Sequence, residues 1–155
     1  MRVWRICKKE HASSAFSGIG AEKTGGRWNH QGHKMVYTAS SLSLACLELF
    51  VHLEPYLLPG DLISVSAEIP DSVTVERFAV RDLPSDWRDY PAPFSTQNLG
   101  TRWLEEQRSF VLAVPSAVNP EEVNLLLNPL HSGIAFLNKI ETKPFQFDPR
   151  MWKKP

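Results

Sequence analysis

The clearest pattern in the sequence is a strict alternation of apolar and polar residues between Asp61 and Ile69. Four apolar residues fall on one side and three polar residues on the other: Ile63, Val65, Ala67 and Ile69 against Ser64, Ser66 and Glu68. A two-residue period is that of a β-strand, whose successive side chains point to opposite faces. The pattern therefore predicts a strand with one buried and one exposed face.

Shorter apolar segments predict the other strands. Four of them lie at 2–7, 35–38, 110–114 and 123–127. The tail 143–155 is expected to hold a last short strand followed by a loose end. Helices are predicted over 41–53 and 96–107, and the proline-rich segment 82–98 predicts a surface excursion with at most one helical turn. Because strands and helices alternate irregularly, an α+β domain is favoured over a doubly wound sheet.

The predicted helix 41–53 is apolar around nearly its whole circumference, which is typical of a buried helix. Three of its polar residues, Ser41, Glu48 and His52, share one narrow stripe. A carboxylate is rarely buried without a partner, because desolvation of the charge is costly. Two interpretations of Glu48 follow: an ion pair with His52 or an arginine inside the core, or a catalytic or ligand-binding carboxylate that faces a cleft.

A second cluster lies in the glycine-dense stretch, where Gly25 and Gly26 precede Arg27, Trp28 and Asn29. Adjacent glycines allow a close approach of the backbone to a ligand, and the guanidinium fork suits a phosphate or a carboxylate. The stretch matches neither a Walker A loop nor a GxGxxG motif. The alternative is a tight turn with a surface arginine and a core tryptophan.

Three further residues are candidates for binding. Tyr37, in a predicted strand, is suited to stack on a flat ring, although a strand tyrosine also serves simply as core. Arg5 is flanked by Trp4 and Ile6, so we expect it to pair with an acid or with a bound anion. Ser116 ends an apolar strand without a GxSxG elbow, so it is expected to hydrogen-bond a ligand or cap a turn rather than act as a nucleophile.

Composition limits the remaining possibilities. A chain of 155 residues, with 43% hydrophobic and 22% charged residues, is expected to form one domain of ordinary size. Its zero formal net charge removes the basic excess expected of a general nucleic-acid binder. Neither the histidines nor Cys7 and Cys46 have metal-ligand spacing, and we expect both cysteines to be reduced, buried thiols. Without an apolar run long enough for a membrane span, a cytoplasmic protein is expected.

Taken together, these motifs resemble the RES domain family, named for an Arg, a Glu and a Ser. The resemblance rests on the following segments in order: Trp4-Arg5-Ile6, Gly25-Gly26-Arg27-Trp28-Asn29, Val36-Tyr37-Thr38, Ala45 with Glu48, Val114-Pro115-Ser116 and Asn128-Pro129-Leu130-His131. It implies a single RES-type domain over 1–155. It also implies an ADP-ribosyltransferase-like fold with a split, mainly antiparallel sheet flanked by helices.

The resemblance further implies a function and a set of site residues. Family members are bacterial toxins of toxin-antitoxin pairs that degrade NAD by hydrolysis or phosphorolysis, or transfer ADP-ribose to a protein. By resemblance, Arg27, Glu48 and Ser116 are the naming residues and Tyr37 is the active-site tyrosine. Arg5 is similar to the first-strand arginine of the wider ADP-ribosyltransferase fold. NAD is then a substrate with no separate cofactor or metal, and the expected partner is an Xre-type antitoxin covering the cleft.

Elementary chemistry explains why such residues would be needed. Breaking the nicotinamide–ribose bond builds oxocarbenium character on the ribose, which a fixed carboxylate on Glu48 can offset. Arg5 and Arg27 would clamp the pyrophosphate. Tyr37 would stack on the nicotinamide. Neutral hydrogen bonds from Asn29 and Ser116 would position the ribose or nicotinamide.

Three alternatives to NAD degradation remain at this point. ADP-ribosylation of a cellular protein uses the same chemistry with a different acceptor. A ribonuclease toxin is disfavoured by the neutral charge. A non-catalytic binding module would use Glu48 and Arg27 only as a core ion pair.

Overall fold

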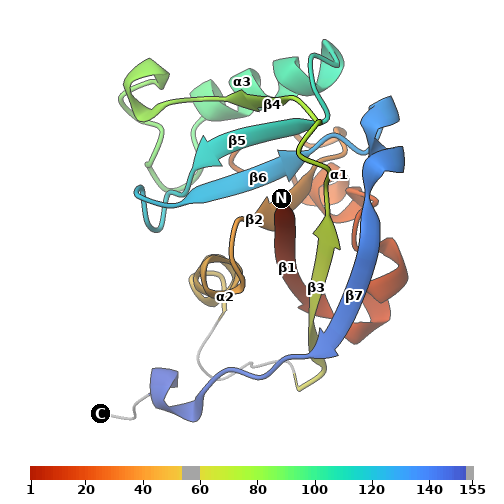
Figure 1. Ribbon diagram of the computed structural model, residues 1–155. Coiled ribbons are helices and arrows are strands. Elements are labelled where there is room, and N and C mark those ends of the chain that lie inside the picture. The colour runs from red at the N-terminus through yellow and green to blue at the C-terminus, as the bar shows by residue number, and fades with distance from the viewer. Residues whose placement is uncertain (54–59, 153–155) are drawn as a thin grey trace.

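The computed structural model describes residues 1–53 and 60–152 as one mixed sheet with helices around it (Figure 1). Its elements follow in chain order: β1 (Arg2–Lys8), η1 (Lys9–Ser14), α1 (Ile19–Thr24), β2 (Val36–Ala39), α2 (Leu42–Phe50), β3 (Leu62–Glu68), β4 (Val75–Arg77), η2 (Val80–Asp82), α3 (Phe94–Glu105), β5 (Val111–Pro115), β6 (Val123–Leu127), η3 (Ser132–Phe136), β7 (Asn138–Pro144) and η4 (Pro149–Trp152). The predicted α+β class is confirmed. The loose end expected at 153–155 lies outside the described residues.

The sheet has the strand order β4-β5-β6-β2-β1-β3-β7 and is antiparallel except for the parallel pair β4 and β5. Its two halves are joined weakly, because β1 and β2 share a single residue pair, Trp4 with Ala39. By contrast, β1 and β3 pair along seven residues, from Arg2 to Lys8. In Figure 1 the strands of the two halves run in clearly different directions. This is the split sheet that the sequence resemblance implied.

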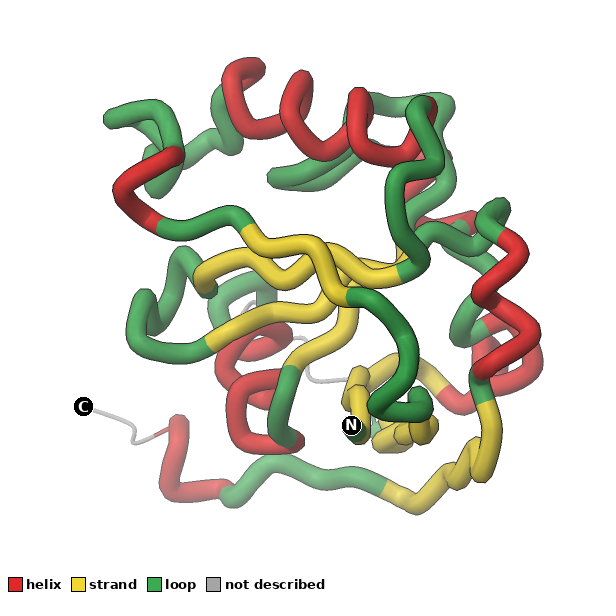
Figure 2. The backbone as a smooth tube through the Cα atoms, turned by 45° about the horizontal axis from the view of Figure 1, so that its top comes forward, coloured by secondary structure: helices red, strands yellow, loops and turns green. Residues whose placement is uncertain are grey.

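Helices cover the sheet on separate sides. Figure 2 shows α3 lying across the top of the sheet, where the fully buried Trp103 packs against Leu112 and Leu126. Near the split, α2 packs its Leu44 and Ala45 against Ile6 and neighbouring residues. The 3-10 helix η1 lies on the opposite face, where Ala12 and Ala15 contact Val65. The two sides of the lower half-sheet are therefore covered by different elements.

Two expectations about burial were wrong. In β3 the polar face is also buried, since Ser64 and Ser66 are only 6% and 2% exposed. These serines share a face with Leu62, which packs into the cluster formed with α2 and Phe147. In α2 only Leu44 and Ala45 are buried, and Val51 just after the helix is 54% exposed. The helix contacts the sheet along one side only, so its uniform apolar composition does not produce uniform burial.

Element boundaries differ in a few places from those predicted. Helix α2 begins after Ser41, whose Oγ accepts a hydrogen bond from the Leu44 amide at 3.1 Å, and it ends at Phe50 rather than at residue 53. Helix α3 begins at Phe94, directly after Pro93. The tail strand β7 starts earlier than predicted, and the three-residue strand β4 was missed because it is too short to show a period.

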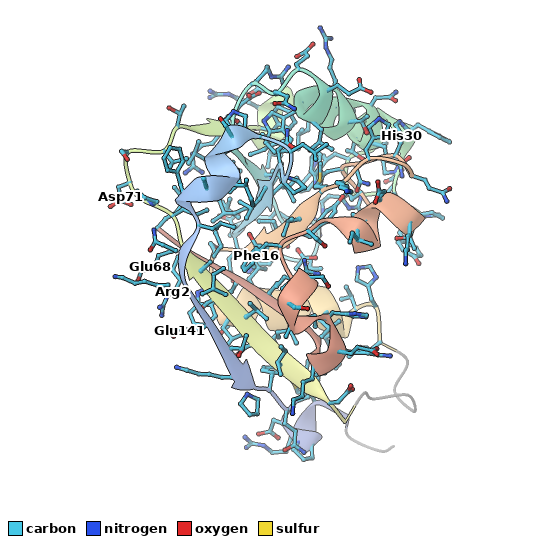
Figure 3. The ribbon with its side chains drawn as sticks, turned by 90° about the vertical axis from the view of Figure 1, so that its right-hand side faces the viewer. Arg2, Phe16, His30, Glu68, Asp71 and Glu141 are labelled. Atoms are coloured by element: carbon cyan, nitrogen blue, oxygen red, sulfur yellow. The ribbon has the colours of Figure 1, made fainter. Side chains whose placement is uncertain are left out.

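The outer edge of the sheet is charged. All seven residues of β7 are exposed, and this strand pairs only with β3. Arg2 lies 3.7 Å from Glu68 and 3.6 Å from Glu141, so it bridges acids on two neighbouring strands (Figure 3). Charges of this kind protect an edge strand from pairing with another chain.

The described residues hold no group of three side chains suited to bind a metal ion. Cys7 and Cys46 are free thiols, as expected, but both remain partly exposed. Burial raises the pKa of each thiol, which reduces its reactivity. Within the same residues, no helix has both the length and the apolar character of a membrane span.

Candidate functional site

Helix α2 presents Glu48 to the neighbouring ends of β5 and β6. The hydroxyl of Ser116, one residue past β5, donates to Glu48 Oε1 at 2.7 Å. The side-chain amide of Asn124, in β6, donates to the same oxygen. Both donors are neutral, so they orient the carboxylate without placing a positive charge on it.

Ser116 is itself held in one orientation. It is fully buried, and its Oγ accepts hydrogen bonds from the amides of Val118 at 3.1 Å and Asn119 at 3.0 Å. A hydroxyl has one proton and two lone pairs. Because the two amides occupy the lone pairs, the Ser116 proton is directed to Glu48.

The second carboxylate oxygen of Glu48 has a different environment. Within the described residues, Oε2 accepts no hydrogen bond, and it is not among the buried atoms that lack a partner. It is therefore accessible to a ligand. In the same part of the chain Glu48 forms no ion pair with Arg27 or with His52, so the core ion pair considered from the sequence is not present there.

Arg27 is the arginine on which the charge of this carboxylate acts. Burial lowers the pKa of Arg27, and the negative charge of Glu48 is the strongest of the influences that raise it again. The Nη1 group donates to the carbonyl oxygens of Trp87 at 2.7 Å and Asp89 at 2.9 Å. The N–H groups on Nε and Nη2 have no partner among the described residues, so they are available to an anion.

Tyr37 is fixed by the loop that carries Arg27. Its hydroxyl donates to Asn29 Oδ1 at 2.7 Å and accepts from the Trp28 amide at 3.0 Å. A Cβ at Gly26 would lie 2.5 Å from the Tyr37 hydroxyl, so only glycine allows this approach. Burial raises the pKa of Tyr37 far above its ordinary value, which keeps the phenol neutral. At neutral pH Tyr37 is therefore an uncharged aromatic side chain.

Asn29 does not lie where it could contact a ligand. It is fully buried, and its Nδ2 donates to three backbone carbonyls within or beside the loop, those of Ala21, His30 and His33. Its remaining polar atom is occupied by Tyr37. The sequence predicted a substrate contact for Asn29, and the structure instead makes it the residue that shapes the loop and positions Tyr37.

Helix α3 packs against the same loop and forms hydrogen bonds with it. The carbonyl of Trp28 approaches Gly100 so closely that a Cβ at that position would overlap it. Gln97 Nε2 donates to the Gly26 carbonyl at 3.0 Å, and Thr101 Oγ1 accepts from the His30 amide at 2.9 Å. Gly100, inside the predicted helix, thus allows the close contact between helix and loop.

Arg5 is separated from the other candidates. Along β1 it shares a face with Cys7, opposite Val65, whereas the Trp4 and Ile6 side faces α2. Its Nη1 donates to the Ala15 carbonyl at 2.6 Å, and its buried Nε has no partner among the described residues. Burial lowers its pKa, and no acid pairs with it in that part of the chain. The structure therefore brings together Arg27, Tyr37, Glu48 and Ser116, but places Arg5 on the other face of the sheet.

With this geometry in place, comparison with known proteins assigns the family. The family model described as the RES domain matches residues 2–148. The chain belongs to the RES domain family. The single RES-type domain expected over 1–155 stays a prediction.

Several relatives of this RES domain are similar over nearly their whole length. It is 42% identical over 152 residues to "Toxin Res" of Yersinia enterocolitica, which covers 97% of this chain and 99% of the relative. It is 40% identical over 155 residues to the "Prs ADP-ribosylating toxin" of Sphingobium sp. The match covers 97% of this chain and 96% of that relative. Among solved structures, the M. tuberculosis MbcT-MbcA toxin-antitoxin complex contains a chain with the same fold. The TM-score is 0.74 at 16% identity, covering 97% of this RES domain and 86% of that chain.

Sequence analysis missed two contributors to this RES domain site. Asn124 sits in a predicted strand that is otherwise apolar, and its polarity there was the only signal that could have identified it. The segment Trp87–Asp89, whose carbonyls bind Arg27, lies in the proline-rich excursion expected only to cover the surface. Neither forms a motif that can be read from spacing alone.

Proposed function

We propose that this RES domain is the toxin of a toxin-antitoxin system and that it degrades NAD by cleaving the nicotinamide–ribose bond. The observation that best supports NAD cleavage is the state of Glu48. One carboxylate oxygen is held by Ser116 and Asn124, the other is accessible, and the charge of the carboxylate acts on Arg27. The relatives named as toxins support the biological role.

In the proposed reaction the bond between ribose C1′ and the nicotinamide nitrogen breaks, and its electron pair leaves with the nicotinamide. The ring departs as a neutral molecule, so no general acid is required. Glu48 Oε2 accepts a hydrogen bond from a ribose hydroxyl and stabilises the positive charge that develops on the ribose. Water then attacks C1′ and releases a proton to give ADP-ribose; in phosphorolysis, inorganic phosphate takes the place of water.

The other residues would bind and orient NAD. Arg27 directs its Nε and Nη2 groups to the diphosphate, and the partly buried ring of Tyr37 packs against the nicotinamide, whose positive charge favours an aromatic face. Asn29 and Ser116 act indirectly, since the first holds Tyr37 and the second holds Glu48. Arg5 has no place in this scheme, because it lies on the opposite face of the sheet.

We propose further that an antitoxin protein, expected to be of the Xre type, covers this site and blocks entry of NAD. The fold shared with a chain of the MbcT-MbcA toxin-antitoxin complex supports a partner of this kind. We expect neither membrane nor direct nucleic-acid binding.

Transfer of ADP-ribose to a protein is the second candidate, because one relative with 40% identity is named an ADP-ribosylating toxin. Hydrolysis, phosphorolysis and transfer to a protein differ in the molecule that accepts the ADP-ribose. The antitoxin-free chain is incubated with NAD, with and without phosphate, and with candidate target proteins. Free ADP-ribose indicates hydrolysis, a phosphate-dependent product indicates phosphorolysis, and an added ADP-ribose in the intact mass of a target indicates transfer. No release of nicotinamide under any of these conditions would contradict the proposal.

A further inference from the structure

The segment Trp87–Asp89 connects two parts of the site. Its carbonyls at Trp87 and Asp89 accept hydrogen bonds from Arg27, as described above. The residue between them, Arg88, extends the other way, and its Nε donates to the Ala117 carbonyl at 3.2 Å. Ala117 directly follows Ser116, which holds Glu48. This three-residue segment thus contacts both Arg27 and the residue that follows Ser116.

The segment is firmly anchored. The side chain of Trp87 is only 7% exposed, and its amide donates to the Pro84 carbonyl at 3.1 Å. The guanidinium of Arg88 lies over the Trp87 ring, 5.9 Å from its centroid. Arg88 is exposed, yet its Nε hydrogen bond and its position on the ring restrict where the charge can lie.

Arg27 and Arg88 are linked through the same segment. The positive charge of Arg88 lowers the pKa of Arg27, against the larger effects of Glu48 and Asp89, which raise it. Neither arginine forms an ion pair with a carboxylate among the described residues; both are held there by backbone carbonyls. Because no direct ion pair occupies either guanidinium among these residues, both remain able to bind an anion through charge-assisted hydrogen bonds.

The free donors define the anion. In Arg27 the Nε and Nη2 groups are available, and in Arg88 both Nη groups lack a partner within the described residues. Planar guanidinium forks bind pairs of phosphate oxygens through two parallel hydrogen bonds. A diphosphate carries two adjacent phosphate groups, each with its own oxygens, so two neighbouring forks suit a diphosphate better than a single phosphate.

We propose that Arg88 binds the diphosphate of NAD together with Arg27 and makes the site selective for ligands that contain an ADP-ribosyl diphosphate. This inference rests on the proposed function. It assigns to Arg88 the second guanidinium that sequence reasoning had assigned to Arg5.

The test measures ligand binding separately from turnover. ADP-ribose and nicotinamide riboside, which lacks a diphosphate, are titrated calorimetrically into the full chain carrying Glu48→Gln, with and without Arg88→Gln. Removing one charge-assisted fork should weaken ADP-ribose binding about 10- to 100-fold. Binding of nicotinamide riboside should change less than about twofold, because it makes no contact with the fork. Arg88→Lys should retain part of the lost affinity.

Kinetics supply a second readout in the otherwise unchanged chain. Arg88→Gln should raise the KM for NAD by about the same factor and leave kcat within about threefold, because the fork binds the diphosphate and not the reacting atoms. The matched control is Arg81→Gln, an exposed arginine whose nearest acid is Asp82 at 3.8 Å, and it should change neither value.

The outcomes separate the inference from the function on which it rests. If the unmodified chain consumes NAD but Arg88→Gln retains its KM and its affinity for ADP-ribose, the role of Arg88 is wrong and the proposed function stands. If the unmodified chain neither binds ADP-ribose nor consumes NAD, both are wrong.

Discussion

At the residue scale, the proposed chemistry depends on how the two oxygens of Glu48 differ. Ser116 and Asn124 both donate to Oε1, while Oε2 makes no hydrogen bond within the described residues. A carboxylate fixed by neutral donors keeps a defined direction before substrate arrives, which is the condition for electrostatic stabilisation of a transition state. An ion pair with an arginine would instead have consumed part of the charge that the reaction needs.

Replacing Ser116 tests this arrangement. Ser116→Ala removes one donor to Glu48, so kcat for NAD consumption should fall about tenfold or more. It also deprives the amides of Val118 and Asn119 of their acceptor, which should lower the free energy of unfolding by about 1–3 kcal/mol. Steady-state kinetics and urea unfolding measure the two effects. Ser43→Ala, at an exposed position of α2, is the control and should change neither. A variant at Ser116 with full kcat would show that the hydrogen bond has no catalytic role.

Tyr37 gives a prediction about pH. Because its pKa is raised in the folded chain, the phenol stabilises the fold fully below its ordinary pKa of 10.0, and this contribution is lost as the pH rises above that value. Tyr37→Phe should therefore lower stability at neutral pH and flatten the decline in stability above pH 10. Tyr90→Phe, at an 85% exposed position, should leave the whole profile unchanged. Parallel profiles for the unmodified chain and Tyr37→Phe would contradict this account.

The residues that the sequence could and could not identify differ in a physical way. Arg27, Tyr37, Glu48 and Ser116 were grouped by the family resemblance, and the structure places them in one region of the molecule. Arg5 and Asn29 were assigned to NAD, but strand parity turns Arg5 to the other face and a full set of hydrogen bonds retains Asn29 in the interior. The face of a strand that packs against a distant helix is set by the topology of the whole sheet. The spacing of residues along that one strand therefore cannot predict it.

At the element scale, the contact between α3 and the glycine-rich loop places Arg27 and Tyr37. Gly100 lies inside the helix, where glycine normally weakens a helix by about 1 kcal/mol relative to alanine. Glycine is needed here because the Trp28 carbonyl occupies the space that a side chain at position 100 would fill. The loop is thus held by helix packing in addition to its own turn residues.

This contact predicts opposite effects for two similar substitutions. Gly100→Ala should destabilise the chain by more than about 2 kcal/mol, because the added Cβ overlaps the Trp28 carbonyl. Gly20→Ala in α1 meets no atom within 4 Å, so it should be neutral or stabilising. Urea unfolding of both variants provides the comparison. Equal stability of Gly100→Ala and the unmodified chain would show that the loop can move away without cost.

Elements were predicted best where their own residues carry a local signal, such as an apolar run or a capping residue. The strand over 123–127 was placed correctly to the residue, and the cap at Ser41 marks the start of α2. Strand β4 has three residues and forms only by parallel pairing with β5, so its sequence carries no signal of its own. Burial of both faces of β3 and exposure of part of α2 depend on which elements cover them.

At the scale of the whole molecule, the site forms where the two half-sheets meet. Helix α2 packs near the split and turns Glu48 toward the ends of β5 and β6, while the loop from Gly25 and the segment Trp87–Asp89 complete the site. These parts are distant in sequence and are joined only in the folded chain. The neutral net charge fits a ligand recognised by a local pair of arginines and not by a broad basic surface.

The central claim is that Glu48 drives cleavage of NAD, and nicotinamide release by the purified, antitoxin-free chain tests it most directly. The unmodified chain should release nicotinamide, and Glu48→Gln should reduce the rate by about 100-fold or more with little change in Tm. Glu121→Gln, at an exposed position, should behave like the unmodified chain. Full nicotinamide release by Glu48→Gln would contradict the account.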